Sequence, residues 1–150
     1  MTLQRQIKEL HDHFIIREPS HFGPRHLVSS FFGSILVALT FMFKGLLFEV
    51  SQGLQFNNLV LITLSTWLIL SAEIYYIGYA RVQQKPKRKF GQFWIKRLMA
   101  YYAIGLFVST TLVYLYGLHL LIGPEFYKII VAVSFPASLG AAAADLLNKY

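Results

Sequence analysis

Cysteine is absent from this 150-residue chain, and charged residues are scarce. Without cysteine there is no disulfide, no thiolate metal ligand and no cysteine nucleophile. Charged residues make up 14% of the sequence, against roughly 25% in an ordinary globular domain. The chain is instead 55% hydrophobic and 16% aromatic. A soluble domain of this length could not bury so much apolar surface, so the composition indicates a membrane protein.

The familiar motifs of hydrolases, nucleotide-binding loops and zinc proteases are also missing. There is no Gly-x-Ser-x-Gly, no phosphate-binding loop and no His-Glu-x-x-His. We therefore expect no enzymatic activity and no cofactor. Four histidines precede the first apolar segment, but their spacing does not match a metal site, so we expect no bound metal and a solvated, weakly pH-sensitive segment instead. They are His11, His13, His21 and His26.

Four apolar segments are each long enough to cross a membrane. They cover about residues 27–48, 56–80, 98–122 and 126–147. At 1.5 Å per residue, about 20 residues cross the ~30 Å hydrocarbon core. Pro24 suits the first turn of the first helix, and the connections at 50–55 and 123–125 indicate tight hairpin turns. The predicted fold is an all-α bundle of four transmembrane helices over residues 24–150.

Residues 1–23 precede the spans and contain no apolar core of a signal peptide. Leu3, Ile7, Leu10 and Phe14 recur at helical spacing and form one apolar stripe. We expect a cytoplasmic amphipathic helix followed by a linker. The helix would lie on the membrane surface, on a neighbouring subunit or on a soluble domain.

The basic residues predict the orientation of the chain, whose net charge is +7. With four spans, only Lys44 and Lys128 of the 14 Lys and Arg residues fall on one side of the membrane. The positive-inside rule then places both termini and the central loop in the cytoplasm, in a multi-pass protein of the cell membrane. Topology thus explains the charge without nucleic acid. The central loop also carries candidates for binding anionic lipid head groups, namely Lys85, Lys87, Arg88 and Lys89.

A shift of 72 residues aligns the first pair of spans with the second. The aligned pairs are Arg25 with Arg97, Gly33 with Gly105, Gly45 with Gly117, and Glu73 with Asp145. Such a shift is typical of two parallel-repeat hairpins, related by an axis along the membrane normal. The alternative is coincidence among small and charged residues, because the overall identity between the halves is low.

Charged residues within spans are costly and usually face protein or water. Glu73 is the deepest acid, and Asp145 lies near the end of the fourth span. Each is either an ion or proton site or a carboxylate paired with a basic residue. Lys44, in the outer part of the first span, is either an interfacial anchor or part of an ion pathway.

The fourth span combines a proline with small residues. Pro136, which follows Ser134 by two positions, predicts a helix break or kink. The residues that follow it, including Ser138, are almost all small as far as Ala144. Small residues allow close helix packing, which predicts that this span is the centre of the bundle or of an oligomer. Alternatively, they leave room for a water-filled path in which carbonyl groups near Pro136 bind a cation.

The last twelve residues of this span resemble the closing motif of a family. The segment 134–145 reads Ser-Phe-Pro-Ala-Ser-Leu-Gly-Ala-Ala-Ala-Ala-Asp. It is similar to a family of small integral membrane proteins of prokaryotes that is known as a domain of unknown function. The resemblance extends over about residues 25–147. It implies a membrane protein, and no substrate or catalytic residue.

Together these features favour a homo-oligomeric ion channel or small transporter for cations or protons. Because four short helices hardly enclose a path alone, a pore needs several copies in the lipid bilayer. The candidate pathway residues are Glu73, Asp145, Lys44, Pro136, Ser134 and Ser138. Two other functions stay open: a non-transporting scaffold or partner subunit, and a lipid-binding membrane protein. Dry, paired carboxylates would favour the scaffold.

Overall fold

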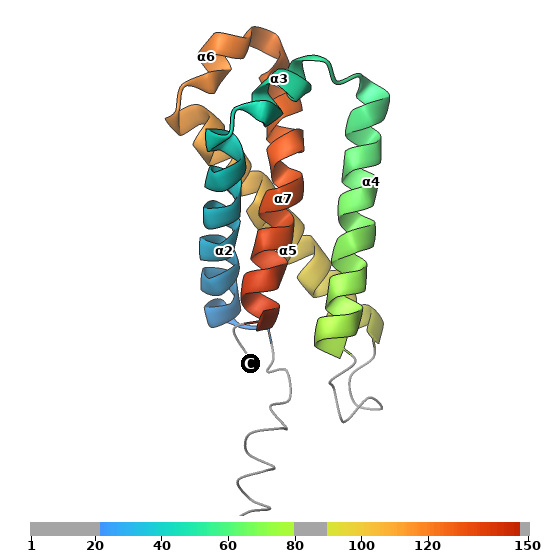
Figure 1. The fold of residues 1–150 in the computed structure, drawn as a ribbon. Coiled ribbons are helices and arrows are strands. Elements are labelled where there is room, and N and C mark those ends of the chain that lie inside the picture. Colours follow the sequence, from blue (N-terminus) through green and yellow to red (C-terminus); the bar gives the residue numbers. More distant parts are fainter. Residues whose placement is uncertain (1–21, 80–89, 148–150) are drawn as a thin grey trace, which may run out of the picture.

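The structure is a computed structural model that describes residues 22–79 and 90–147, and four long helices dominate it (Figure 1). They are α2 (Pro24–Phe43), α4 (Phe56–Glu73), α5 (Phe90–Leu115) and α7 (Phe126–Leu147). A π-helix, η1 (Ile74–Gly78), extends α4. Within the described ranges there is no strand. Four helices are long and apolar enough to cross a membrane, which confirms the predicted all-α architecture.

Two sequence predictions lie outside the described residues. The first is the amphipathic N-terminal helix and its linker, predicted over residues 1–23, of which residues 1–21 are outside the described ranges. The head-group candidates of the central loop are also outside: Lys85, Lys87, Arg88 and Lys89. Both stay predictions.

The second and fourth spans lie close to where the sequence places them, but the first and third differ. α2 ends at Phe43 rather than at residue 48, and α5 covers Phe90–Leu115 rather than 98–122. A left-handed glycine follows each of these helices: Gly45 has a φ of 70° and Gly117 a φ of 67°. A residue in this conformation cannot continue an α-helix. The hydrophobic runs are therefore longer than the helices that cross the membrane.

After each of these glycines the chain forms a short helix. The two are α3 (Leu46–Gln52) and α6 (Leu118–Ile122). A 3-10 turn, η4 (Gly123–Glu125), then leads into α7. The first connection is thus a short helix followed by a turn, and not only the tight turn that the sequence predicts. Gly45 and Gly117 are partners in the 72-residue alignment and have the same local role.

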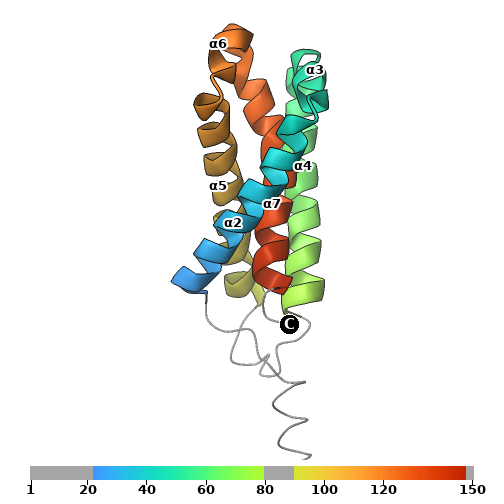
Figure 2. The same ribbon diagram turned by 60° about the vertical axis from the view of Figure 1, so that its left-hand side comes forward.

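The two ends of the bundle differ in what they contain (Figures 1 and 2). At one end, here called the hairpin end, α3 and α6 connect the long helices. At the other, here called the terminal end, α2 begins and α7 ends, and the described parts of α4 and α5 face the central loop. Figure 2 shows that α2 crosses α7 obliquely.

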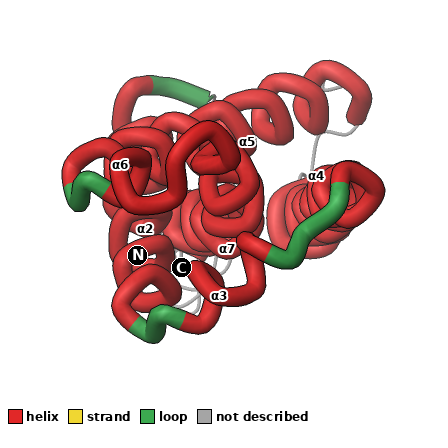
Figure 3. The backbone as a smooth tube through the Cα atoms, turned by 90° about the horizontal axis from the view of Figure 1, so that it is seen from above, coloured by secondary structure: helices red, strands yellow, loops and turns green. Residues whose placement is uncertain are grey.

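α7 is the central helix, as the small residues of the fourth span predict (Figure 3). It contacts α2, α5 and α4, and 67% of its span is buried, against 39% or less for the others. A Cβ atom on Gly140 would lie 2.7 Å from the carbonyl oxygen of Gly33, so the backbones of α2 and α7 approach directly. Gly105 of α5 packs against Ser138 of α7 in the same way.

Of the break or kink predicted at Pro136, the break is wrong, because α7 is one continuous helix from Phe126 to Leu147, and the kink stays a prediction. Proline cannot donate a backbone hydrogen bond. Here it is buried, and small neighbours such as Ala132 and Ala137 are buried beside it. Close packing holds the helix together across this position.

Candidate functional site

Four polar side chains meet inside the bundle near the terminal end; we call them the Asp145 cluster. Asp145 of α7 is its centre, and its Oδ1 lies 2.5 Å from Nδ1 of His26 on α2. Its Oδ2 accepts hydrogen bonds from Arg97 at 3.0 Å and from the Tyr101 hydroxyl at 2.5 Å, both on α5. The guanidinium of Arg97 also donates to the Tyr101 hydroxyl at 2.9 Å. The cluster therefore ties three helices together through one carboxylate.

The cluster is dry, since Asp145 is 2% exposed, Arg97 1% and Tyr101 0%. His26 is 8% exposed. A buried charge is tolerated when it is paired and hydrogen-bonded, and here the carboxylate balances the guanidinium. Arginine stays protonated in proteins.

Aromatic rings cover the cluster. Phe22 stacks on the imidazole of His26, with ring centroids 5.6 Å apart. The guanidinium carbon of Arg97 lies 4.5 Å from the ring centre of Phe93 and 5.5 Å from that of Phe22. Such cation–π contacts stabilise a desolvated cation. They also keep the local dielectric low, which strengthens the contacts to Asp145.

Small and polar residues continue from the cluster along one face of each helix. The faces are His26, Ser30 and Ser34 on α2; Arg97, Tyr101, Gly105 and Ser109 on α5; and Asp145, Ser138 and Ser134 on α7. The next residue of the α2 face, Ala38, packs with Val108 of α5 and Ala137 of α7. On this face of α2, Ser30 and Ser34 lie between His26, which contacts α7, and Ala38, which packs with α5 and α7. The two serines therefore lie where α2, α5 and α7 meet.

Three serine hydroxyls in this junction have no hydrogen-bond partner within the described part of the chain. They belong to Ser30, Ser34 and Ser138, and each residue is 0% exposed. By contrast, Ser109 donates to the carbonyl of Gly105 at 2.7 Å. A buried hydroxyl in a native protein is nearly always hydrogen-bonded to protein, water or an ion. The three serines are therefore candidates to bind water or a small cation, and together with the Asp145 cluster we call them the polar column.

An apolar core fills the same junction toward the hairpin end; we call it the apolar plug. It consists of Ala38, Val108, Leu112, Val113, Ile129, Val133 and Ala137. The polar column and the apolar plug thus divide the junction into two halves. Ser134 lies at the level of the plug, between Val133 and Ala137 along α7, and its hydroxyl donates to the carbonyl of Val131 at 2.8 Å.

Glu73 does not join the Asp145 cluster, because none of the partners of Asp145 comes from α4. It is half-buried at the end of α4. Its Oε2 atom is buried and has no hydrogen-bond partner among the described residues. The π-helix η1 starts directly after it, and such segments are frequent at functional sites. The structure therefore leaves Glu73 as a separate candidate.

The other sequence candidates are spread through the molecule. Lys44 is exposed and ends α2, far along the helix from His26. Pro136 and Ser134 are buried in α7 toward the apolar plug. Of the six pathway candidates, only Asp145 and Ser138 belong to the polar column.

Sequence reasoning missed three members of the cluster. The prediction that His26 belongs to a solvated segment is wrong, since it is buried against Asp145. By sequence, Arg97 is interpreted as a basic residue that sets the topology and as the partner of Arg25 in the 72-residue alignment, and Tyr101 is not among the candidates. A signal was present: Arg97, Tyr101, Gly105 and Ser109 recur every four residues, which is the spacing of one helix face.

The 72-residue alignment stays a prediction, and the Asp145 cluster does not follow it. Gly33 and Gly105 both contact α7. Arg25, however, is exposed where its counterpart Arg97 is buried. Glu73 likewise has no equivalent of the contacts that Asp145 makes. The cluster takes His26 from the first half of the alignment and its other three members from the second, so it is not repeated.

A comparison with protein families gives a match over nearly all of the described chain. Residues 21–147 match the family described as "Putative integral membrane protein (DUF2391)". Neither the curated proteins nor the solved structures give a match. The match agrees with the four membrane-spanning helices.

Proposed function

The chain belongs to this family of integral membrane proteins, and we propose that it is a homo-oligomeric channel or small transporter for protons or small cations. The observation that carries the proposal is the polar column, with its buried ion pair, its histidine and its three unpartnered hydroxyls. Ionisable residues inside membrane proteins are costly and often mark ion or proton pathways. No enzymatic activity, cofactor or nucleic-acid partner is part of the proposal.

In the proposed mechanism His26 binds and releases the proton. Asp145 lies 2.5 Å from its Nδ1 and stabilises the imidazolium that forms. A proton on His26 places a second cation beside the carboxylate that already pairs with Arg97. The Arg97–Asp145 contact then weakens, because two cations share one anion. His26 can thus couple proton binding to the contact between α5 and α7.

The hydroxyls of Ser30, Ser34 and Ser138 continue the path. A serine hydroxyl can donate and accept at the same time, so it can hold a water molecule or a cation in a chain of hydrogen bonds. Ser30 lies one helical turn from His26, and Ser34 one turn further. The polar column would carry the ion from the Asp145 cluster to the middle of the bundle.

The apolar plug closes this path toward the hairpin end. Hydrophobic constrictions of this kind gate membrane pathways by excluding water. Transport then requires that α2 or α5 separates from α7 around residues such as Val108 and Val133. We propose that protonation of His26 favours this movement by weakening the contact of α5 with Asp145.

The proposal also includes the location of the protein and its orientation in the membrane. We place it in the cell membrane, with both termini and the terminal end of the bundle in the cytoplasm, because the basic residues gather there. The outward faces of the helices suit the lipid bilayer, since large apolar side chains are exposed on them. Examples are Phe32, Leu61, Leu68 and Leu115, which are 61–73% exposed.

The experiment is a flux measurement on the full-length protein in liposomes. A pH-sensitive dye inside the liposomes reports proton entry after a potential is imposed, and a sodium-sensitive dye reports sodium entry in a parallel sample. We expect proton or sodium entry above that of protein-free liposomes, and its loss in His26→Gln. Glu125→Gln is the control, because this exposed residue pairs only with Lys128 among its described neighbours. Entry equal to that of protein-free liposomes would reject the proposal.

A non-transporting scaffold is the second candidate. The observation in its favour is that Asp145 is paired and nearly dry, as expected of a carboxylate that only holds helices together. Ion flux distinguishes the two functions, because only the transport function predicts proton or cation entry. Absence of flux together with a loss of stability in Asp145→Asn would support the scaffold.

A further inference from the structure

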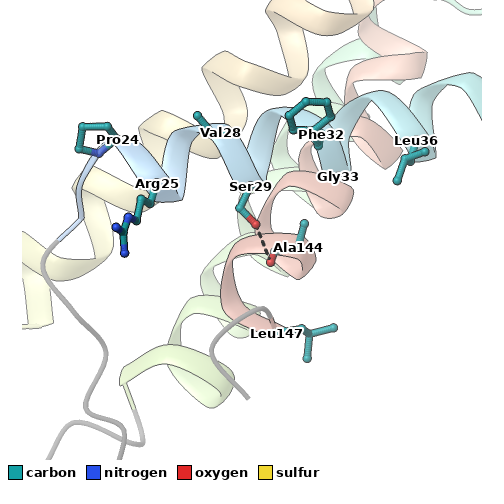
Figure 4. Close-up of a pocket in the computed structure, with 9 residues that line it drawn as sticks. All are labelled: Pro24, Arg25, Val28, Ser29, Phe32, Gly33, Leu36, Ala144 and Leu147. Atoms are coloured by element: carbon teal, nitrogen blue, oxygen red, sulfur yellow. Dashed lines mark hydrogen bonds between the residues drawn. The ribbon is translucent and has the colours of Figure 1, made fainter.

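A groove lies between α2 and α7 on the outer surface of the bundle, at the terminal end (Figure 4). It holds about 910 Å³, within the range of roughly 300–1,000 Å³ that is usual for small-molecule sites. Its apolar lining includes Val28, Phe32, Leu36 and Leu147. Gly33 and Ala144, which also line the groove, lie directly against each other.

Arg25 is the charged residue of the lining, and it lies at the terminal end of the groove. Its side chain is exposed in the first turn of α2. No described residue of the lining is acidic, so the groove itself does not neutralise the guanidinium. The groove is thus apolar along its length and cationic at the end where a membrane surface lies.

We propose that this groove binds one anionic phospholipid, with its phosphate on Arg25 and an acyl chain along Val28, Phe32 and Leu36. The planar guanidinium matches the oxygen atoms of a phosphate group in a two-pronged contact. The positive end of the α2 dipole adds a weaker attraction for the same anion. A single cation at the head of an apolar groove requires a ligand with one charged end and a long apolar part, which is the form of a phospholipid.

The groove shares its wall with the polar column. Arg25 and Ser29 face the groove, whereas their neighbours His26 and Ser30 are buried in the helix junction. The hydroxyl of Ser29 donates to the carbonyl of Ala144 at 3.0 Å, one residue before Asp145 (Figure 4). A lipid in the groove would therefore stabilise the same α2–α7 contact that holds the Asp145 cluster.

Native mass spectrometry of the full-length protein in detergent tests the site. The protein is titrated with phosphatidylglycerol or with phosphatidylcholine, and bound lipid is counted. One basic residue near an anionic lipid surface contributes about 1 kcal/mol, which is about fivefold in binding. We expect Arg25→Gln to weaken phosphatidylglycerol binding by about that factor and phosphatidylcholine binding by less, because phosphatidylcholine carries the same phosphate but its choline cation offsets the charge. Arg25→Lys should retain part of the preference, because lysine keeps the charge and loses the two-pronged contact.

The matched control is Lys96→Gln, another exposed basic residue in the first turns of its helix, at the same end of the bundle. If it weakens binding as much as Arg25→Gln, the attraction comes from diffuse charge and the site is rejected. Val28→Trp fills the groove and should lower the binding of both lipids, whereas Leu61→Trp on α4 should not. Lipid-free dimers that bury this face would also reject the site. The measurement is independent of ion flux, so it can fail or succeed separately from the proposed transport function.

Discussion

The imidazole of His26 and the carboxylate of Asp145 are 2.5 Å apart, although 119 positions separate the two residues in the chain. The contact connects the first turn of α2 to the last turn of α7. Because Arg97 binds the other carboxylate oxygen, one side chain holds both neighbouring helices. Loss of this carboxylate should therefore weaken the packing of both α2 and α5 on α7 at the terminal end.

Asp145→Asn is expected to destabilise the protein by about 3–5 kcal/mol, because it leaves the buried guanidinium of Arg97 without a counter-charge. Unfolding of the purified protein in detergent, followed by circular dichroism, measures the loss. The control is Glu125→Gln, whose partner Lys128 lies 2.8 Å away at the surface; this change should cost about 1 kcal/mol or less. Equal losses in both variants would show that the Asp145 ion pair does not hold the helices.

Gly33→Ala is expected to weaken the packing of α2 on α7. The added methyl group would overlap Ala144 and the carbonyl oxygen of Gly140, so the helices must separate. Overpacking of this kind costs about 1–3 kcal/mol. Gly91→Ala in α5 is the control, because its methyl group would meet nothing within 4 Å. Since alanine favours helix more than glycine does, this control should be neutral or slightly stabilising.

Gly45→Ala and Gly117→Ala should each destabilise by about 1–2 kcal/mol, because both positions require a left-handed backbone. Gly53→Ala is the comparison, since Gly53 has an ordinary φ of −84°. Thermal unfolding of the three variants gives the values. Similar losses at Gly45 and Gly117 would support the equivalence of the two hairpins. A neutral result at either position would contradict the role assigned to that glycine.

Glu73→Gln is expected to stabilise the protein by up to about 1 kcal/mol. One oxygen of this carboxylate is buried and has no partner among the described residues, so removal of the charge relieves a cost of burial. Unfolding of the variant in detergent tests this, with Glu49→Gln, an exposed acid near the hairpin end, as the control. A loss of stability would show that Glu73 forms an ion pair that the protein needs.

Hydropathy alone was sufficient to predict the helical spans, because a membrane requires long apolar helices and allows few alternatives. The ends of α2 and α5 were not predictable in this way. The hydrophobic run continues past Gly45 and Gly117, and only the local backbone conformation ends the helices there. Continuity of α7 through Pro136 likewise depends on its neighbours in the bundle.

Of the four members of the Asp145 cluster, only Asp145 was predictable from the sequence. Asp145 stands out as an acid within an apolar span, whereas Arg97 and His26 look like residues that flank a membrane. What brings them to Asp145 is the rotation of α2 and α5 about their axes, which depends on packing against α7. Single-sequence periodicity does not determine that rotation, so the partners of Asp145 required the structure.

Two serines give the sharpest test of whether the polar column carries the ion. Ser34→Ala combined with Ser138→Ala removes two hydroxyls that have no partner in the described part of the chain, so the thermal midpoint should not fall. Ion flux into liposomes should nevertheless drop well below that of the wild type. Ser109→Ala, whose hydroxyl binds its own helix, should conduct normally. Unchanged flux in the double variant would show that these hydroxyls do not carry the ion.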